Sequence, residues 1–559
     1  MKKKITSVVL ALSVCSSLGS FASCKFDDGI EQIDTSKTQL YVQNFDGGFG
    51  SDWLWSLKEK YEKAHAEDVY EKGKKGVQIM LSNAKILAGD LEKNIMEASE
   101  EVFFTQNFDC LFDYIARDFL LDISDIVTEK LPGENRSIED KMTEQQKDFL
   151  CVDYTNSGNG KYYAIPHYSV YTGIIYDIDL FENEGLYLLD DGTYSVPGAF
   201  NDGKYMASGR LSTGPDGKYE TYDDGLPATY EEFFALCDYM VNKSITPFNW
   251  LGKGGDWYLS DVRLSMYADY EGIEQMSLNY NLNGTAKNLI SVDENNNITK
   301  LPNTNITPQN AYELSMQAGQ YYSIDFMSKI KTNTSYHNAN KTGSMTYTHL
   351  QAQSDFLYSS YKKAPIAMLI DGAWWENEAT DTFKAMEQFS LGKMDRRFGL
   401  MPFPKATQDK VGERFTVYDG KMAYGVIAKA TPSYKHELAK DFLQFCYTDE
   451  NLAEFSEMTN SFRDLDYTLT DAQISKLSSF GKSMYDIKVS KTMDIVYPLS
   501  DNVDFLSNMG TFTYGIDQTY TDGYVVNIST YLGKMSPADM IKAQKEYRIS
   551  IWDNLNFSK

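Results

Sequence analysis

The sequence is poor in the side chains that most often bind transition metals. Its 559 residues include 6 cysteines and 5 histidines, with no CxxC pair and no HExxH motif. A zinc site of either kind is therefore not expected. Outside the N-terminal segment the cysteines are Cys110, Cys151, Cys237 and Cys446. Their long spacings leave one or two disulfides open, although Cys237 and Cys446 stand in apolar helical patterns that favour a buried hydrophobic role.

Positive charge and long apolar runs are also scarce. The formal net charge is −26, from 79 acidic and 53 basic residues, which argues against nucleic acid or an anionic membrane surface as a partner. After residue 22 no segment approaches 18 uninterrupted apolar residues, so we expect a soluble body. The acids of residues 184–226 raise a calcium loop as an alternative, but the order of ligands in an EF-hand loop is absent.

The first 24 residues follow the order of a bacterial lipoprotein export signal. Lys2 to Lys4 precede an apolar stretch that serines interrupt and that ends in Phe21-Ala22-Ser23-Cys24. We predict cleavage before Cys24 and lipidation of its thiol, which tethers the remaining chain to the membrane. Phe21 departs from the usual leucine, and Cys15, preceded by the bulky Val14, is the competing site. An ordinary secretory signal with a chance cysteine is the plain alternative.

Strands and helices alternate after the signal. Residues 24–37 are polar and acidic without periodicity, as a tether is. Strands are then predicted at 40–42, 77–81 and 101–105, alternating with helices that begin near Asp52, Leu87 and Leu111. This order predicts a βαβ sheet with helices on both faces, whose ligand loops lie at the carboxyl ends of the strands. The loops 44–50, 82–85 and 106–109 are therefore expected to form one rim.

Further strands and turns follow along the chain. Two short strands around a polar aromatic bend are predicted within 162–177, further strands at 366–370, 398–404 and 422–427, and an amphipathic helix over 433–447. Residues 184–226 carry four Asp-Gly pairs, which are typical of hairpin turns because glycine accepts positive φ. Thr229 and Glu232 form a capping box at the start of a helix.

Four segments, taken in order, resemble a known family. They are EVFFTQNFDCLFDYIARDFLLDISD, YYAIPHYSVYTGIIYD, APIAMLIDGAWWENE, and FGLMPFP followed by YDGKMAYGVIAKATPSYKHELAKDFLQF. Their order and spacing resemble the extracellular solute-binding proteins of ABC importers, in the sugar-binding group (family 1) that includes the maltodextrin-binding proteins. The resemblance covers nearly the whole chain after the signal. The insertion 184–226 and the long segment after Asn451 depart from simple members.

The resemblance implies an α/β fold of the two-lobed periplasmic-binding-protein type (type II). Each lobe is a sheet flanked by helices, and the ligand is held in the cleft between the lobes. The expected divisions are a signal peptide at 1–23, a tether at 24–37, lobe one at 38–127 and 413–460, and lobe two at 128–412 and 461–559, with the hairpin-rich insertion 184–226 in lobe two.

A sugar site needs flat aromatic faces and fixed polar groups for the hydroxyls. Trp374 follows the predicted strand 366–370, where the family often stacks a ring on sugar. It is preferred over Trp375 because only one of two adjacent helical side chains can face the cleft. The other candidates for ligand contact are Asn44, Asp46, Asn107, Asp109, His167, Tyr168, Trp250, Asp256, Trp257, Tyr418 and Asp419.

Some of these candidates also have a purely structural interpretation. Asp46 and Asp109 each precede a predicted helix that they could cap. A lone histidine such as His167 is usually structural, although this one stands in a polar aromatic bend. The glycines of NWLGKGGDWY, between Trp250 and Trp257, could serve only a turn.

Together these features favour a membrane-tethered receptor on the extracellular face of a bacterial cell. We expect a monomer without cofactor or metal that closes on a carbohydrate, in particular an oligosaccharide, and passes it to the permease subunits of an ABC importer. Two alternatives stay open. One is a secreted glycoside hydrolase that uses two carboxylates, and the other is a binding protein for a non-sugar solute such as a peptide or polyol.

Overall fold

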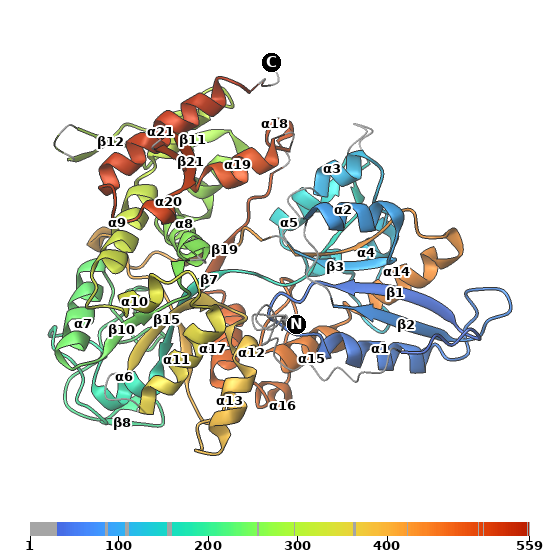
Figure 1. Cartoon of the computed structure of the whole chain (residues 1–559), viewed down its shortest axis with the longest axis horizontal. Helices are drawn as coiled ribbons and strands as arrows, with labels where there is room; N and C mark the ends of the chain where they lie inside the picture. Colours follow the sequence, from blue (N-terminus) through green and yellow to red (C-terminus); the bar gives the residue numbers. More distant parts are fainter. Residues whose placement is uncertain are drawn as a thin grey trace, which may run out of the picture.

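A computed structural model describes residues 31–559, except 84–87, 107–110, 154–158, 254–255, 294, 296, 362–364, 422, 501, 507, 522, 556 and 558–559. The predicted signal, Cys15, Cys24 and the first part of the tether lie outside the described residues, as do Asn107 and Asp109. The described chain forms two lobes, each built on a sheet with helices packed against it (Figure 1). Within these described residues, no helix combines the length and apolarity needed to cross a membrane.

The first sheet contains the predicted βαβ unit. Its strand order is β2-β1-β3-β18-β6, and the strands are β1 (Thr38–Asn44), β2 (Val77–Ser82), β3 (Val102–Thr105), β18 (Tyr424–Ile427) and β6 (Ile165–Pro166). β1, β2 and β3 are parallel, whereas β18 runs antiparallel to both β3 and β6. The helices after the first three strands are α1 (Asp52–Ala64), α2 (Ala88–Glu97) and α3 (Leu111–Ala116). The carboxyl ends of the parallel strands therefore share one edge, as predicted.

A late segment of the chain returns to this first lobe. α14 (His436–Phe445) and α15 (Asp449–Thr459) follow β18, and Figure 1 shows them in orange beside the blue β1, β2 and α1. Leu438 and Phe442 of α14 are fully buried, four positions apart on one helix face. The Tyr61 hydroxyl of α1 donates to Asp441 Oδ2 at 2.9 Å, which joins α1 to α14.

The second lobe is built on a mixed sheet of order β10-β15-β7-β16. Its strands are β10 (Thr246–Asn249), β15 (Ile366–Gly372), β7 (Thr172–Asp177) and β16 (Phe398–Met401). The larger helices of this part of the chain are α7 (Tyr230–Asn242), α8 (Asp256–Asn281), α9 (Ala318–Thr332), α11 (His349–Tyr358), α17 (Ser479–Ser490) and α21 (Pro537–Trp552). The predicted capping box starts α7, where Thr229 Oγ1 accepts from Glu232 N. Gly272, at φ +69°, interrupts α8.

Shorter elements connect these layers. The strands are β4 (Cys151–Val152), β5 (Lys161–Tyr162), β8 (Phe200–Asn201), β9 (Lys204–Tyr205), β11 (Gly284–Ala286), β12 (Ile290–Val292), β13 (Ile298–Lys300), β14 (Thr304–Ile306), β17 (Phe415–Tyr418), β19 (Met493–Val496), β20 (Gln518–Thr521) and β21 (Tyr524–Asn527). The helices are α4 (Ser124–Thr128), α5 (Glu144–Leu150), α6 (Ile178–Glu184), α10 (Ala339–Thr342), α12 (Trp375–Glu378), α13 (Thr380–Glu387), α16 (Asp471–Ile474), α18 (Val503–Leu506), α19 (Met509–Gly515) and α20 (Ile528–Tyr531). In the insertion, Asp202 and Gly203, at φ +49° and +75°, form the turn between β8 and β9, as the Asp-Gly pattern predicts.

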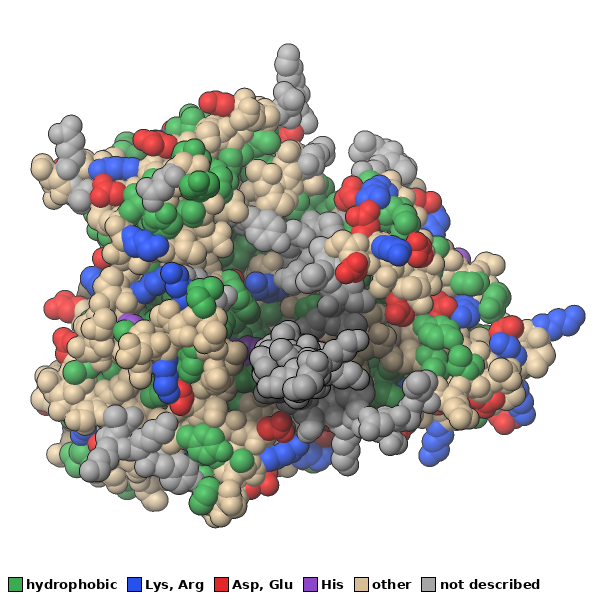
Figure 2. Space-filling view, in the orientation of Figure 1, with side chains coloured by type: hydrophobic (Ala, Val, Ile, Leu, Met, Phe, Trp, Pro, Cys, Tyr) green, Lys and Arg blue, Asp and Glu red, His purple; other side chains and the backbone are tan. Residues whose placement is uncertain are grey.

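Charges of opposite sign are interspersed on the surface. Figure 2 shows acidic and basic side chains scattered over the described part of the visible face rather than gathered by sign. Many are paired, as in Lys440 with Asp125 at 2.8 Å and Arg397 with Asp179 at 2.7 Å. The described part of this face therefore lacks the continuous basic surface that nucleic acid requires.

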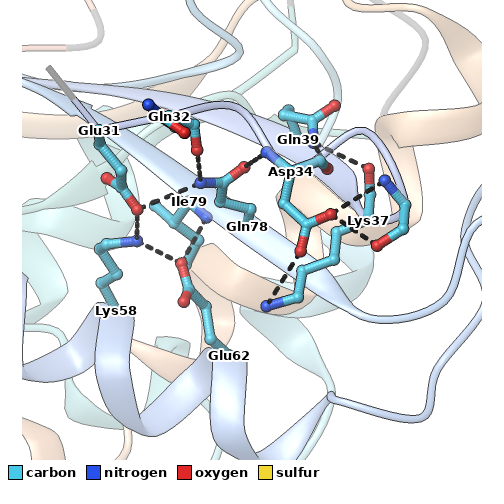
Figure 3. A network of polar contacts seen from close by, with 10 residues as sticks. Glu31, Gln32, Asp34, Lys37, Gln39, Lys58, Glu62, Gln78 and Ile79 are labelled. Atoms are coloured by element: carbon cyan, nitrogen blue, oxygen red, sulfur yellow. Dashed lines mark hydrogen bonds and ion pairs between the residues drawn. The ribbon is translucent and has the colours of Figure 1, made fainter.

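The last residues of the predicted tether are held against the first lobe. Asp34 N donates to Gln78 Oε1 at 2.7 Å, and Gln78 Nε2 donates to the Gln32 carbonyl oxygen at 2.9 Å. Lys58 of α1 pairs with Glu31 at 2.8 Å (Figure 3). Residues 31–37 therefore belong to the folded lobe, although their sequence has the composition of a linker.

The expected lobe limits stay a prediction, and two strands bear on where they lie. β6 hydrogen-bonds within the first sheet although it comes after residue 127. β17, which comes after residue 412, pairs with β19 and packs on α8 rather than joining the first sheet. We therefore propose that the chain leaves lobe one near residue 166 and re-enters it near residue 419.

Candidate functional site

The loop after β1 forms the lobe-one side of the candidate site. Asp46 Oδ1 accepts hydrogen bonds from Gly48 N and Gly50 N, both at 3.1 Å. Ser51, not Asp46, is the N-cap residue of α1, and no side-chain bond caps that helix. Asp46 therefore orders the loop instead of capping the helix. Gly48 and Gly50 have φ of +90° and +75°, a region that only glycine adopts readily.

Two further residues that the sequence predicts to contact ligand pack against this loop. Asn44 Nδ2 donates to Asn83 Oδ1 at 3.4 Å, so the loops after β1 and β2 meet at one rim. The Tyr168 hydroxyl lies 3.3 Å from the Phe45 carbonyl oxygen. Its ring centroid is 4.4 Å from that of Phe49. Asn44 and Tyr168 are both buried, so they hold the loop in place.

Adjacent tryptophans enter different hydrophobic cores. Trp374 is only 5% exposed, and it belongs to the buried cluster that contains Leu40 of the first sheet. A Cβ added to Gly48 would lie 2.7 Å from Trp374 Cδ1, so the lobe-one loop covers this ring. Trp375 belongs to the core of its own lobe, with ring contacts to Phe398 at 5.1 Å. Trp374 thus faces lobe one and Trp375 does not, as the helical spacing predicts.

Two carboxylates that sequence reasoning missed lie beside Trp374. Gln353 of α11 donates through Nε2 to Asp371 Oδ2 at 3.0 Å and to Glu378 Oε2 at 2.8 Å. Burial, and then the charge of Glu378, raise the pKa of Asp371 well above its usual range. A signal for the pair was present, because DGAWWENE places an acid on each side of Trp374. The partner Gln353 comes from another helix and gives no such signal.

The first turn of α8 adds aromatic rings to the same region. Tyr258 is buried with its ring centroid 6.1 Å from that of Trp374 in a T-shaped contact. Trp257 is 43% exposed, and Lys421 Nζ lies 5.2 Å from its ring centroid. Lys421 Nζ also lies 3.5 Å from Asp261 Oδ2. Asp256 is the first residue of α8, and its side chain lies outside the described residues.

Two predicted site residues lie in hydrophobic cores instead of a cleft wall. His167 is 1% exposed, with its ring centroid 4.9 Å from that of Phe104. Burial, and then the nearby charge of Arg463, lower the pKa of His167 well below its usual range. Trp250 is buried in the core of the second lobe, 4.4 Å from the ring of His337. In this structure the rings of His167 and Trp250 pack against core aromatics, and their contact with ligand stays a prediction.

Asp419 lies where the chain crosses between the lobes. Asp419 Oδ2 accepts from Val170 N at 2.6 Å and Oδ1 accepts from Lys421 N at 3.0 Å, so it joins two crossing segments. Burial raises the pKa of Asp419 to about 7. With Asp464 it lines a cavity of about 20 Å³, which holds about one water and no sugar ring. Tyr418 is also buried. Neither residue lines a space for a sugar in this closed arrangement.

No metal site is evident in the described part of the chain. Among those residues, no three His, Cys, Asp or Glu side chains are placed to hold an ion. The site as described is thus an aromatic and acidic patch of lobe two, formed by Trp374, Tyr258, Asp371 and Glu378 and covered by the Asp46 loop of lobe one.

Comparisons with known proteins identify the fold. No family model and no curated protein sequence matches the chain. Among solved structures, a chitin oligosaccharide binding protein aligns over 93% of this chain and 100% of its own, with a TM-score of 0.54 and 15% identity. RafE from Streptococcus pneumoniae aligns over 93% of this chain and 100% of its own, with a TM-score of 0.52 and 13% identity. The GacH receptor of Streptomyces glaucescens aligns over 93% of this chain and 100% of its own, with a TM-score of 0.50 and 10% identity. Its structure was determined also with acarbose. This chain therefore has the fold of the two-lobed, sugar-binding solute-binding proteins.

Proposed function

We propose that this protein captures an oligosaccharide between its lobes and delivers it to the permease of an ABC importer. The observation that carries the proposal is the placement of Trp374. Its ring belongs to lobe two by sequence, yet it is buried against the lobe-one loop at Gly48. An aromatic ring at that boundary is covered when the lobes close and uncovered when they part. The aligned chitin oligosaccharide binding protein and the acarbose complex of the GacH receptor support a sugar as ligand.

Capture follows from the chemistry of this boundary. When the lobes part, the Asp46 loop leaves Trp374, and a sugar ring can stack its C–H face on the indole. Hydroxyl groups can then donate to the carboxylates of Asp371 and Glu378, and such charge-assisted hydrogen bonds are stronger than neutral ones. Closure would return the loop onto the bound ligand, since the two crossing segments joined by Asp419 allow a hinge.

The anchor and the permease belong to the same proposal. Lipidation at Cys24 would hold the protein at the outer face of the membrane, near its transporter. Residues 31–37 are bound to lobe one, so the free tether is short. The seven residues from Cys24 to Glu31 span at most about 25 Å. Loss of membrane association in Cys24→Ser would support the anchor, and unchanged association would point to Cys15 or an uncleaved signal.

A thermal-shift screen of the purified protein tests the capture of sugar. Raffinose-type, malto- and chito-oligosaccharides are the probes, and a bound sugar raises the unfolding temperature. Trp374→Ala should abolish the shift given by the best sugar. Trp55→Ala is the matched control, since Trp55 is 39% exposed on α1, and it should leave the shift unchanged. An unchanged shift in Trp374→Ala would contradict the site.

A glycoside hydrolase is the second candidate, and the Asp371 and Glu378 pair favours it. Two carboxylates beside an aromatic ring are the groups that such enzymes use. Chromatography of oligosaccharides after long incubation with the protein separates the two functions. We expect ligand-induced stabilisation without products, and release of shorter sugars would overturn the receptor function.

A further inference from the structure

We infer that the outer face of lobe two carries a second saccharide site, in the groove between α7 and α9 and separate from the cleft at Trp374. The groove has a volume of about 710 Å³ and is lined by residues of both helices and of the loop that follows α9. Figure 1 shows α7 at the edge of lobe two that is remote from lobe one. Binding in this groove does not depend on closure of the lobes, so the inference stands apart from the proposed function.

The groove offers flat aromatic surface. Phe234 of α7 and Tyr336 lie nearly parallel, with ring planes 15° apart and centroids 6.2 Å apart. Tyr322 of α9 stacks on Tyr270 of α8, with 5.0 Å between the ring centroids. Phe234 and Tyr322 both line the groove and are half-buried, so part of each ring stays accessible. The C–H faces of sugar rings pack on aromatic surfaces of this kind.

One largely buried hydroxyl at the groove has no hydrogen-bond partner. Tyr230 lines the groove and is only 8% exposed, and no group of the described residues donates to its hydroxyl or accepts from it. Burial, and then the charges of Asp269 and Asp325, raise the pKa of Tyr230. Asp325 also lines the groove, so the Tyr230 hydroxyl lies near that wall. A ligand hydroxyl can donate to it and accept from it, which removes the cost of leaving it unpaired.

The charged groups of the groove favour a neutral, hydroxyl-rich ligand. Lys329 Nζ lies 2.8 Å from Asp325 Oδ2, and the Tyr336 hydroxyl donates to Asp238 Oδ1 at 2.8 Å. Each carboxylate keeps its other oxygen as an acceptor, and the Lys329 ammonium keeps further donor hydrogens. An anion would meet these two carboxylates and the exposed Glu231, whereas a cation would compete with Lys329 and Tyr336. Saccharide hydroxyls can use the donors and the acceptors together.

Affinity electrophoresis tests the second site with polysaccharides, whose chains are long enough to retard a bound protein in a native gel. Separate gels contain amylopectin, hydroxyethylcellulose, glycol chitin or inulin, and a gel without polysaccharide gives the reference mobility. We expect one or more of these polysaccharides to retard the purified protein. We also expect the retardation to persist in Trp374→Ala, because the groove lies outside the cleft.

Two substitutions assign the binding to the groove. Tyr322→Ala removes an aromatic ring and should weaken the affinity for the retarding polysaccharide by about tenfold. Tyr230→Phe keeps the ring and removes only the unpartnered hydroxyl, so it should weaken the affinity by about fivefold without loss of stability in urea. Tyr434→Ala is the matched control, since Tyr434 is 48% exposed just before α14 of lobe one, and it should leave the retardation unchanged.

The outcomes separate this inference from the proposed function. Retardation by none of the four polysaccharides would overturn the inference. Retardation that disappears in Trp374→Ala and persists in both groove variants would overturn it as well, because the polysaccharide would then bind in the cleft. Both groove variants should keep the thermal shift that oligosaccharides give and that Trp374→Ala loses. If no oligosaccharide gives that shift while the retardation depends on Tyr230 and Tyr322, only the proposed function fails.

Discussion

Two glycines of one loop offer a paired test of the lobe contact at Trp374. Gly48 and Gly50 both follow β1, both have positive φ, and both donate a backbone hydrogen bond to Asp46 Oδ1 at 3.1 Å. A Cβ on Gly48 would lie 2.7 Å from Trp374 Cδ1, whereas a Cβ on Gly50 would meet nothing within 4 Å. Gly48→Ala and Gly50→Ala therefore share a backbone cost and differ in the contact between lobes.

The magnitudes separate the two effects. An alanine at positive φ costs about 1–2 kcal/mol, and the lost freedom of the unfolded chain returns about 0.4–1 kcal/mol. Both variants should thus lose about 1 kcal/mol of unfolding free energy. The clash at position 48 acts only when the lobes are closed, so opening relieves it without unfolding. A cost of about 2 kcal/mol to the closed state lowers its population relative to the open state by about 30-fold.

Urea unfolding and small-angle X-ray scattering measure these two quantities. We expect a larger radius of gyration for Gly48→Ala and a radius like that of the unsubstituted protein for Gly50→Ala. The unfolding free energy of Gly48→Ala should fall below that of Gly50→Ala by no more than the clash itself, about 2 kcal/mol, because opening relieves the clash without unfolding. Equal radii in both variants would show that the loop does not pack on Trp374 in solution, and the reasoning about closure would be refuted.

Three further predictions concern the cores and the buried acids. Trp375→Ala should lower the unfolding free energy in urea by about 3–5 kcal/mol, and a loss below 1 kcal/mol would contradict its core position. Burial raises the pKa of Asp419 and of Glu271 to about 7, whereas the value in the unfolded chain is about 4. The stability that protonation of these groups gives the folded state is therefore complete below pH 4 and is lost as the pH rises through 7. Urea unfolding should therefore give a lower free energy at pH 8 than at pH 5, and Asp419→Asn should flatten this slope; a steady rise with pH would contradict the sign. Cys237 and Cys446 are free, buried thiols whose pKa burial raises, so neither should react with a thiol reagent before unfolding, and rapid labelling of either would contradict its burial.

Local patterns predicted most of the first lobe. The strands β1, β2 and β3 and the helix α1 lie where the apolar periodicities place them, because residues a few positions apart determine which face is buried. The capping box at Thr229 and the turn at Asp202 and Gly203 are equally local. The order of the four segments also led to the two-lobed fold, which the aligned structures show.

Sequence patterns do not reveal the surroundings of residues whose partners come from elsewhere in the chain. His167 stands in a polar bend by sequence, yet its ring packs on Trp53 and Phe104 beside Arg463. No feature of the sequence near His167 predicts these contacts, since the partners come from α1, β3 and the segment after α15. Residues 31–37 have a linker composition, but Gln78 and Lys58 bind them to the lobe.

The sequence by itself determined the order of strands and helices, the rim loop at Asp46, and the fact that only one of Trp374 and Trp375 can face lobe one, because these properties depend on spacing along the chain. The tertiary structure alone decided which polar groups meet at that tryptophan. Asp371 is the penultimate residue of β15, Glu378 ends α12 and Gln353 lies in α11, so their contact depends on how three elements pack. Packing also determines the burial that raises the pKa of Asp371, so this shift appears only in the folded chain.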